Sequence, residues 1–242
     1  MITTITNRKE LFEENLKRYS DFLTEKIKSE YRSDNSLILN NFYCFGDKNL
    51  MLMGENLSVS GTLTEEDMEE LLSFCQFLGV YGLESYQADL PLGPKNTMHL
   101  MKYTGGVCEN CDEMIKNENI YQFSRFCSDN FSGIAFNTVY SYLARKVNRM
   151  VSDIYYLTDE GKIISGALAT HFDDSLYLTF VSTARKYRKQ GLAKKVISHI
   201  ISQNPQQEIT LMCESELIPF YTKLGFEKTG EIYLYQLRTE HI

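Results

Sequence analysis

One continuous segment of the chain constrains the fold more than any other, because three structural patterns follow one another in it. A strand pattern rich in aromatic and β-branched residues covers residues 175–183, and a basic turn with a single glycine follows it. An amphipathic helix pattern then begins at Gln190 and ends at Asn204-Pro205. The start of a helix at such a turn presents unpaired N–H groups and a favourable dipole. The segment therefore predicts an anion site.

The charge of this turn contrasts with that of the whole chain. The protein has 242 residues and a formal net charge of −7, yet residues 185–195 hold six cations and no acid. The net charge argues against a general nucleic-acid binder, because a polyanion would be repelled outside this patch. A solvated basic helix start is the alternative, but it does not explain the glycine and the preceding strand together. The turn therefore predicts a phosphate-containing ligand.

Composition and cysteine spacing indicate the compartment. No stretch reaches the ~18 consecutive apolar residues of a membrane helix, and the N-terminus lacks the order of a signal peptide. We therefore expect a cytoplasmic protein that binds no membrane. The six cysteines are scattered, which fits reduced thiols better than a disulfide framework. Cys108 and Cys111 have metal or redox spacing, but a second ligand pair is missing, so a plain loop is favoured and no metal is expected.

Periodicity and turn residues predict the remaining elements. Before Gly105 the expected elements are a helix over 9–31, strands over 41–45, 49–53 and 57–60, a helix over 64–78, and strands over 80–86 and 97–103. After Gly105 they are helices over 120–126 and 135–149, strands over 152–157, 162–171 and 175–183, a helix from 190, a strand over 208–213, a helix over 217–224, and two strands around Thr229-Gly230. This order favours an α+β fold with a mixed central sheet, divided into residues 1–104 and 105–242.

Two motifs in residues 120–237 resemble those of the GNAT N-acetyltransferase superfamily. Residues 188–193, RKQGLA, match the family pattern R/Q-x-x-G-x-G/A at the start of the central helix, and Tyr187 precedes them as is common there. Residues 220–226, FYTKLGF, match a second family feature about thirty residues further along. The resemblance implies a mixed αβα sandwich of the GNAT type. It also implies direct transfer of an acetyl group from acetyl-CoA, without a metal, to a primary amine of a small molecule or peptide.

The resemblance also implies which residues hold the cofactor. Pantetheine is expected to pair with the backbone at Val181 and Thr183, and N–H groups of the turn are expected to bind the diphosphate. Gly191 lets the backbone approach the phosphates closely, and charged side chains add attraction. The expected cofactor site comprises Val181, Ser182, Thr183, Arg188, Lys189, Gln190, Gly191, Leu192, Ala193 and Lys194.

Tyr221 and Glu214 are the candidate catalytic residues. The resemblance puts Tyr221 where a phenol protonates the departing CoA thiolate; the alternative is a tyrosine buried in the core. Glu214 stands where the family commonly has asparagine. Its carboxylate could act as the base, anchor a cationic amine, or cap the following helix.

The first hundred residues follow the element order of the cofactor-binding half, as a degenerate GNAT-like module would. Their turn carries three acids, Glu65, Glu66 and Asp67, which stabilise the following helix but repel a diphosphate. If it is a second copy, we expect this module not to bind CoA and to select the substrate or mediate assembly. Two further alternatives stay open: a catalytically silent acyl-CoA sensor of GNAT fold, and a homodimer.

Overall fold

The computed structural model describes residues 2–4, 21–34, 41–53, 56–80, 82–92, 95–106, 113–131 and 135–237. The chain divides into two compact units: Met1–Leu100 with Gly230–Ile242, and Met101–Thr229. The sequence placed all residues after 104 in the second domain, whereas the structure assigns those from Gly230 onward to the first unit. The division into two independent domains stays a prediction.

The first unit is a mixed sheet of six strands in the order β1-β2-β3-β4-β5-β12. Neighbouring strands are antiparallel except β4 and β5, which are parallel. Leu50, Leu57, Leu71 and Leu83 lie in its core. The elements are β1 (Ile2–Thr4), α2 (Asp21–Ser33), β2 (Phe42–Phe45), β3 (Lys48–Met53), β4 (Asn56–Val59), α4 (Glu65–Leu78), β5 (Gly82–Ser85) and the end of β12 (Phe226–Gln236).

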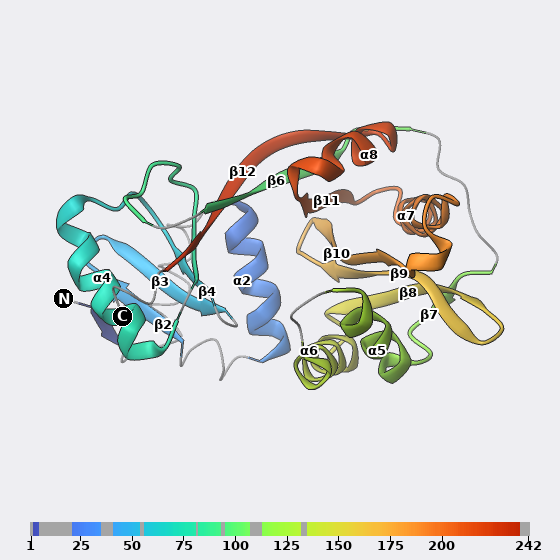
Figure 1. Ribbon diagram of the computed structural model, residues 1–242, viewed down its shortest axis with the longest axis horizontal. Helices are drawn as coiled ribbons and strands as arrows, with labels where there is room; N and C mark the ends of the chain where they lie inside the picture. The colour runs from blue at the N-terminus through green and yellow to red at the C-terminus, as the bar shows by residue number, and fades with distance from the viewer. Residues whose placement is uncertain are drawn as a thin grey trace. The chain divides into compact units, whose positions relative to one another are not determined.

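The second unit contains a mixed sheet in the order β6-β11-β10-β9-β8-β7. Its strands are β6 (Lys95–Tyr103), which begins in the first unit, β7 (Ile115–Lys116), β8 (Ser152–Asp159), β9 (Lys162–His171), β10 (Ser175–Thr183) and β11 (Glu208–Cys213). Its helices are α5 (Ile120–Asn130), α6 (Phe136–Asn148), η1 (Arg185–Tyr187), α7 (Leu192–Gln203), η2 (Ser215–Leu217) and α8 (Ile218–Lys223). Helices α5 and α6 cover one face and α7 the other (Figure 1). The expected mixed αβα sandwich is confirmed.

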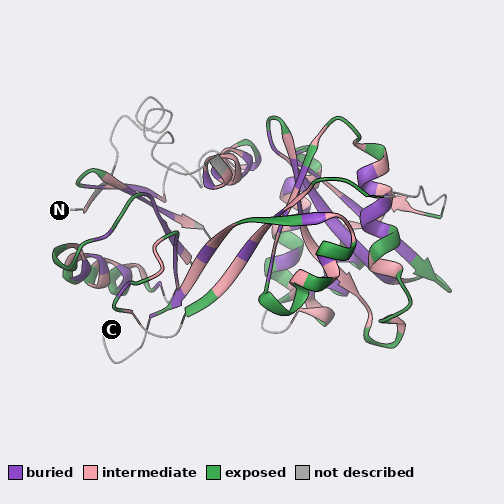
Figure 2. Cartoon of the chain, turned by 90° about the horizontal axis from the view of Figure 1, so that it is seen from above, coloured by how far each residue is buried: buried purple, intermediate pink, exposed green. Residues whose placement is uncertain are grey.

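Strand β9 lies between β10 and β8 inside the sheet and is buried on both faces. Seven consecutive residues of β9, from Ile164 to Thr170, are buried, which is the longest buried run among the strands of this sheet (Figure 2). A strand covered on both faces has no polar alternation. Gly166 is required here for space, because a Cβ would lie 2.6 Å from the Phe123 ring and 2.8 Å from the Tyr155 carbonyl oxygen.

The two sheets share one topology. In each, three antiparallel pairings (β1 to β4, and β7 to β10) are followed by a helix that leads to a parallel partner (β4 with β5, and β10 with β11). The sixth strand of each sheet is β12 in the first unit and β6 in the second. The origin of the first unit as a duplicated GNAT-like module stays a prediction.

Two expectations from the sequence need correction or restriction. Residues 226–236 form one strand, β12, and not two strands around a turn at Thr229-Gly230. Gly230 has no left-handed backbone, and the side chain of Leu100 lies 3.4 Å from where its Cβ would be, so strand pairing overrides the local turn signal. The helix expected over 9–31 is described only from Asp21, and residues 5–20 lie outside the described residues.

Candidate active site

Strands β10 and β11 separate at one point in the second unit. Their parallel pairing runs from Ser175–Glu208 to Leu178–Leu211. Beyond these residues β10 continues to Thr183 and β11 to Cys213, but the two strands no longer pair with each other. A bulge against β9 lies between Thr179 and Ser182, and Phe180 there has a φ of +51°. A bulge re-aims a strand locally. The last five residues of β10 therefore leave their former partner and lead into the basic turn.

The turn after β10 takes a conformation that glycine favours. Gly191 has a φ of +78° and Lys189 a φ of +64°, both in the left-handed region. Nothing lies within 4 Å of the position that a Cβ on Gly191 would take. The glycine is therefore needed for its backbone angle and not because neighbouring protein atoms crowd it.

The N-terminus of α7 has no internal acceptor for its first N–H groups. No described residue accepts a hydrogen bond from the backbone N–H groups of Gly191, Leu192, Ala193 or Lys194. The first helical bond runs from Lys195 N to Gly191 O at 3.0 Å. No side chain caps this helix, and its first turn carries no acid. The unpaired donors, the dipole and the cations together form a site for an anion.

A cavity of about 640 Å³ opens between this turn and α8. Its lining brings together most of the predicted site, namely Val181, Ser182, Thr183, Arg188, Lys189, Gly191, Leu192, Ala193, Lys194 and Tyr221. Gln190 and Glu214 do not line it. Five lining residues were not expected: Asn130, Phe131, Tyr187, Leu217 and Phe220. Leu217 and Phe220 lie within a turn of Tyr221 in sequence, a signal that could have been used, whereas Asn130 and Phe131 are distant in sequence.

Tyr221 combines a buried ring with an unpaired hydroxyl. Its side chain is buried against Phe220 and Phe226, with ring centroids 5.0 and 5.8 Å away. No described residue forms a hydrogen bond with its hydroxyl group. Burial, and secondly the charge of Cys213, raises the pKa of this phenol well above its usual value. The phenol therefore stays protonated at neutral pH and has a proton to donate.

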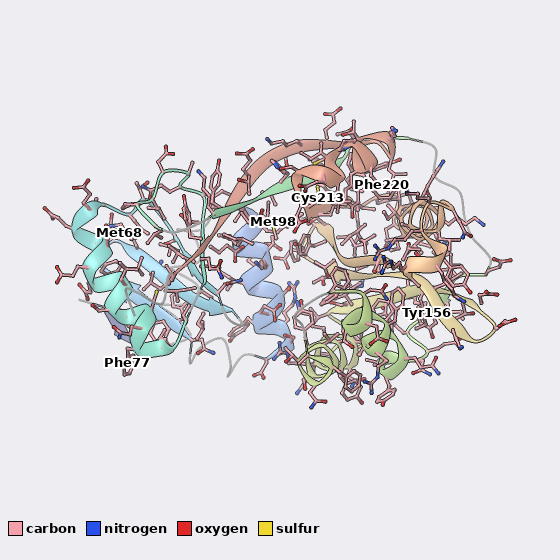
Figure 3. The ribbon with its side chains drawn as sticks, viewed as in Figure 1. Met68, Phe77, Met98, Tyr156, Cys213 and Phe220 are labelled. Atoms are coloured by element: carbon pink, nitrogen blue, oxygen red, sulfur yellow. The ribbon has the colours of Figure 1, made fainter. Side chains whose placement is uncertain are left out.

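Glu214 lies apart from this cavity. Its side chain is exposed, and its backbone carbonyl accepts from Leu217 N at 3.0 Å. The side chain forms no capping hydrogen bond to η2. Neighbouring Cys213 at the end of β11 is buried, which, with the charge of Glu214, raises the pKa of its thiol to about 11. Cys213 and Phe220 of α8 are labelled in Figure 3. The catalytic role of Glu214 stays a prediction.

The described residues contain neither a group of metal ligands nor a helix that could span a membrane. Within the described ranges, no three His, Cys, Asp or Glu side chains are grouped so as to hold a metal ion. Cys108 and Cys111 lie outside the described residues. In the part of the chain that the structure covers, no helix has the length and apolar character needed to span a membrane.

Comparison with known families identifies the second unit. Residues 127–235 match the family model of the acetyltransferase (GNAT) domain. The match runs from the last turn of α5 into β12 and includes every residue that lines the cavity. The match covers slightly less than half of the chain, and it supports membership of this part of the chain in the GNAT acetyltransferase superfamily.

Individual relatives are distant. Serotonin N-acetyltransferase of Mesocricetus auratus is 31% identical over 80 residues, which are 31% of this chain and only 39% of that protein. A GNAT-family acetyltransferase of Colwellia psychrerythraea has a TM-score of 0.61 at 15% identity, with 98% of this chain and 100% of that chain covered. A tandem GNAT protein of clavulanic acid biosynthesis has a TM-score of 0.51 at 10% identity, with 81% of each chain covered. The two structures are similar to this chain in fold.

Proposed function

We propose that the second unit is an N-acetyltransferase that moves an acetyl group from acetyl-CoA to a primary amine. The observation that carries this proposal is the row of four unpaired N–H groups, from Gly191 to Lys194, that begins α7 at the edge of the cavity. Arg188, Lys189 and Lys194 line the same cavity and supply charge for a diphosphate. A pantetheine arm would then run along the part of β10 that has left β11.

The chemistry follows from the other end of the cavity. The amine nitrogen attacks the thioester carbonyl carbon, the C–S bond breaks, and CoA leaves as a thiolate. We propose that Tyr221 gives its proton to that sulfur. Burial raises the pKa of the phenol, and burial of the departing thiolate would raise the pKa of the CoA thiol in the same direction, which offsets the difference between donor and acceptor. Glu214 remains a proposed proton acceptor, acting from outside the cavity lining.

The acceptor is proposed to be an amine with an aromatic or apolar group. No Asp, Glu or His residue lines the described cavity, whereas Phe131, Leu217 and Phe220 do. Such a lining fits an apolar body better than a polycation. The printed name of one relative, serotonin N-acetyltransferase, supports the same class of amine. A small molecule or a peptide amine satisfies these conditions.

The location and the partners of the protein are also part of the proposal. We propose a cytoplasmic location without nucleic-acid or membrane partners, and a homodimer is left to a measurement of mass in solution. Cys44, Cys75, Cys127 and Cys213 are free thiols, as a reducing compartment allows.

The experiment that tests the function measures binding and turnover separately. Calorimetry with CoA tests the cofactor site, and thiol release from acetyl-CoA with tryptamine, phenethylamine, spermidine and a lysine peptide tests transfer. Binding with release by the aromatic amines supports the proposal. Binding without release by any amine favours the silent acyl-CoA sensor, and no binding of CoA contradicts both functions.

A further inference from the structure

The basic turn between β10 and α7 is strained and must be held by contacts from elsewhere. Lys189 is not a glycine, yet its backbone lies in the left-handed region with a φ of +64°. A residue of this kind persists there only where the surrounding structure fixes it. Contacts that fix this turn therefore also fix the direction of the N–H groups that face the cavity.

One side-chain hydrogen bond connects the turn to a strand other than β10. The Tyr187 hydroxyl donates to Asp159 Oδ2 at 2.5 Å. Among the described residues, the other side-chain hydrogen bonds of residues 185–191 stay local: Arg188 Nε donates to Thr183 O at 3.1 Å, Gln190 Nε2 to Lys186 O at 3.4 Å, and Lys186 to Tyr187. Tyr187 itself lines the cavity. Asp159 therefore reaches the cofactor site through a residue of the cavity wall.

Asp159 is held firmly by its position in a hairpin. It is the last residue of β8 and pairs with Lys162, the first residue of β9. The two residues between them, Glu160 and Gly161, have φ values of +49° and +75°. Two left-handed residues are typical of the tight turn whose twist matches its strands. The carboxylate thus stands at the end of a paired strand, next to a two-residue hairpin turn.

The charge of Asp159 would not by itself favour an anion nearby. Lys186, on the same turn, has its pKa raised first by a hydrogen bond with Tyr187 and then by the charges of Tyr187, Asp159 and Glu160. A carboxylate beside a diphosphate site opposes binding by charge. A role through geometry therefore accounts for Asp159 better than a role through charge.

We propose that Asp159 is a positioning residue for CoA, which fixes Tyr187 and so holds the turn open toward the diphosphate. This inference rests on the proposed function, because its ligand is CoA. It predicts that an acceptor atom at Asp159 matters and that its negative charge does not.

Three variants separate these roles when CoA affinity is measured by calorimetry. Asp159→Ala should weaken CoA binding about fivefold to tenfold, the effect of losing one exposed hydrogen bond. Asp159→Asn keeps an acceptor and should stay near the wild type. Tyr187→Phe should match Asp159→Ala, and the double variant should be no weaker than either. Glu160→Gln, a charge change on the same hairpin, is the matched control and should bind as the wild type does.

Steady-state kinetics then distinguish positioning from general damage. The KM for acetyl-CoA should rise in Asp159→Ala while kcat and the KM for the amine stay unchanged, and thermal melting confirms that each variant is folded. Unchanged or tighter CoA binding by Asp159→Ala contradicts the positioning role while leaving the proposed function intact. Additive losses in the double variant contradict it too. A wild type that binds no CoA overturns the proposed function and this inference together.

Discussion

Gly61 and Gly191 share a left-handed backbone, with φ values of +79° and +78°, and each precedes a helix that leads to the parallel partner of the preceding strand. The chain differs around them. Gly61 lies three residues after Ser58, the last residue of β4 paired with β5, whereas Gly191 lies thirteen residues after Leu178 of β10. The first unit therefore lacks a free strand extension along which pantetheine could run.

The N-terminus of α4 is also capped by a side chain of the helix itself, Asp67. Asp67 Oδ2 accepts from Thr64 N at 2.7 Å and from Thr64 Oγ1 at 2.9 Å, and Lys48 Nζ lies 3.2 Å away. This capping box pairs the backbone N–H groups of Thr64 and Asp67. The N–H groups at the corresponding positions of α7 have no such partner. A carboxylate thus stands where a phosphate would have to bind.

The chain should consequently bind one CoA and not two. In its described residues the first unit lacks the strand extension, and three acids occupy the first turn of α4, so we expect only the second unit to hold the diphosphate. Calorimetric titration with CoA gives the number of sites per chain. A stoichiometry of two would show that the first unit also binds the cofactor and that the filled turn is no barrier.

Reversing one charge at the turn should weaken CoA binding selectively. Lys194 lines the cavity, whereas its neighbour Lys195 does not, and both are exposed on the first turn of α7. Lys194→Glu should lower CoA affinity by about tenfold or more, because it sets a carboxylate against the diphosphate. Lys195→Glu makes the same change in net charge and should have a much smaller effect. Equal effects of the two variants would indicate a general response to charge and no local diphosphate site.

Removing one hydroxyl should slow transfer without loosening the cofactor. Tyr221→Phe keeps the buried ring and removes the proton donor, so kcat should fall by about a hundredfold, as expected for loss of general acid catalysis. CoA affinity should not change, because the phenol is proposed to act on the departing sulfur. A variant with the turnover of the wild type would remove Tyr221 from the mechanism and leave it as a core residue.

Asp153 should stabilise the second unit in a pH-dependent way. Burial opposes the charge of this carboxylate, but hydrogen bonds from His171 (2.9 Å), Lys116 (2.9 Å) and Asn117 (2.5 Å) outweigh it and hold its pKa well below the usual value. The stabilisation is therefore present above the unfolded pKa of about 3.9 and lost as pH falls toward the folded pKa.

Asp153→Asn should thus lower the free energy of unfolding by about 2 kcal/mol at pH 7. Denaturant unfolding measured from pH 7 down to pH 3 checks the sign. The gap between variant and wild type should narrow as the pH falls. A gap that is constant over this range would mean that the carboxylate's charge contributes nothing.

Local signals were enough to predict much of this site from the sequence. The Thr64–Asp67 capping box, the glycine at the start of α7 and the strand before it depend on residues a few positions apart. Their conformations follow from dihedral preference and from side chains that reach their own backbone. The anion site and the degenerate turn could therefore be expected before the fold was known.

Contacts between distant residues could not be expected in this way. Tyr187 and Asp159 are 28 residues apart, and Phe131 reaches the cavity from the end of α5. The Thr229-Gly230 pair has the composition of a turn, yet pairing with strands far along the chain keeps it extended within β12. Each of these features depends on contacts between segments that are far apart in the sequence. The spacing of residues along the chain does not predict such contacts.

Acetyl transfer by this protein is measured by the release of free CoA thiol from acetyl-CoA with tryptamine as acceptor. We expect saturable release by the wild type, a raised KM for acetyl-CoA in Lys194→Glu, and near loss of release in Tyr221→Phe. The contradicting result is release by none of the amines at any acetyl-CoA concentration, or release that neither substitution changes.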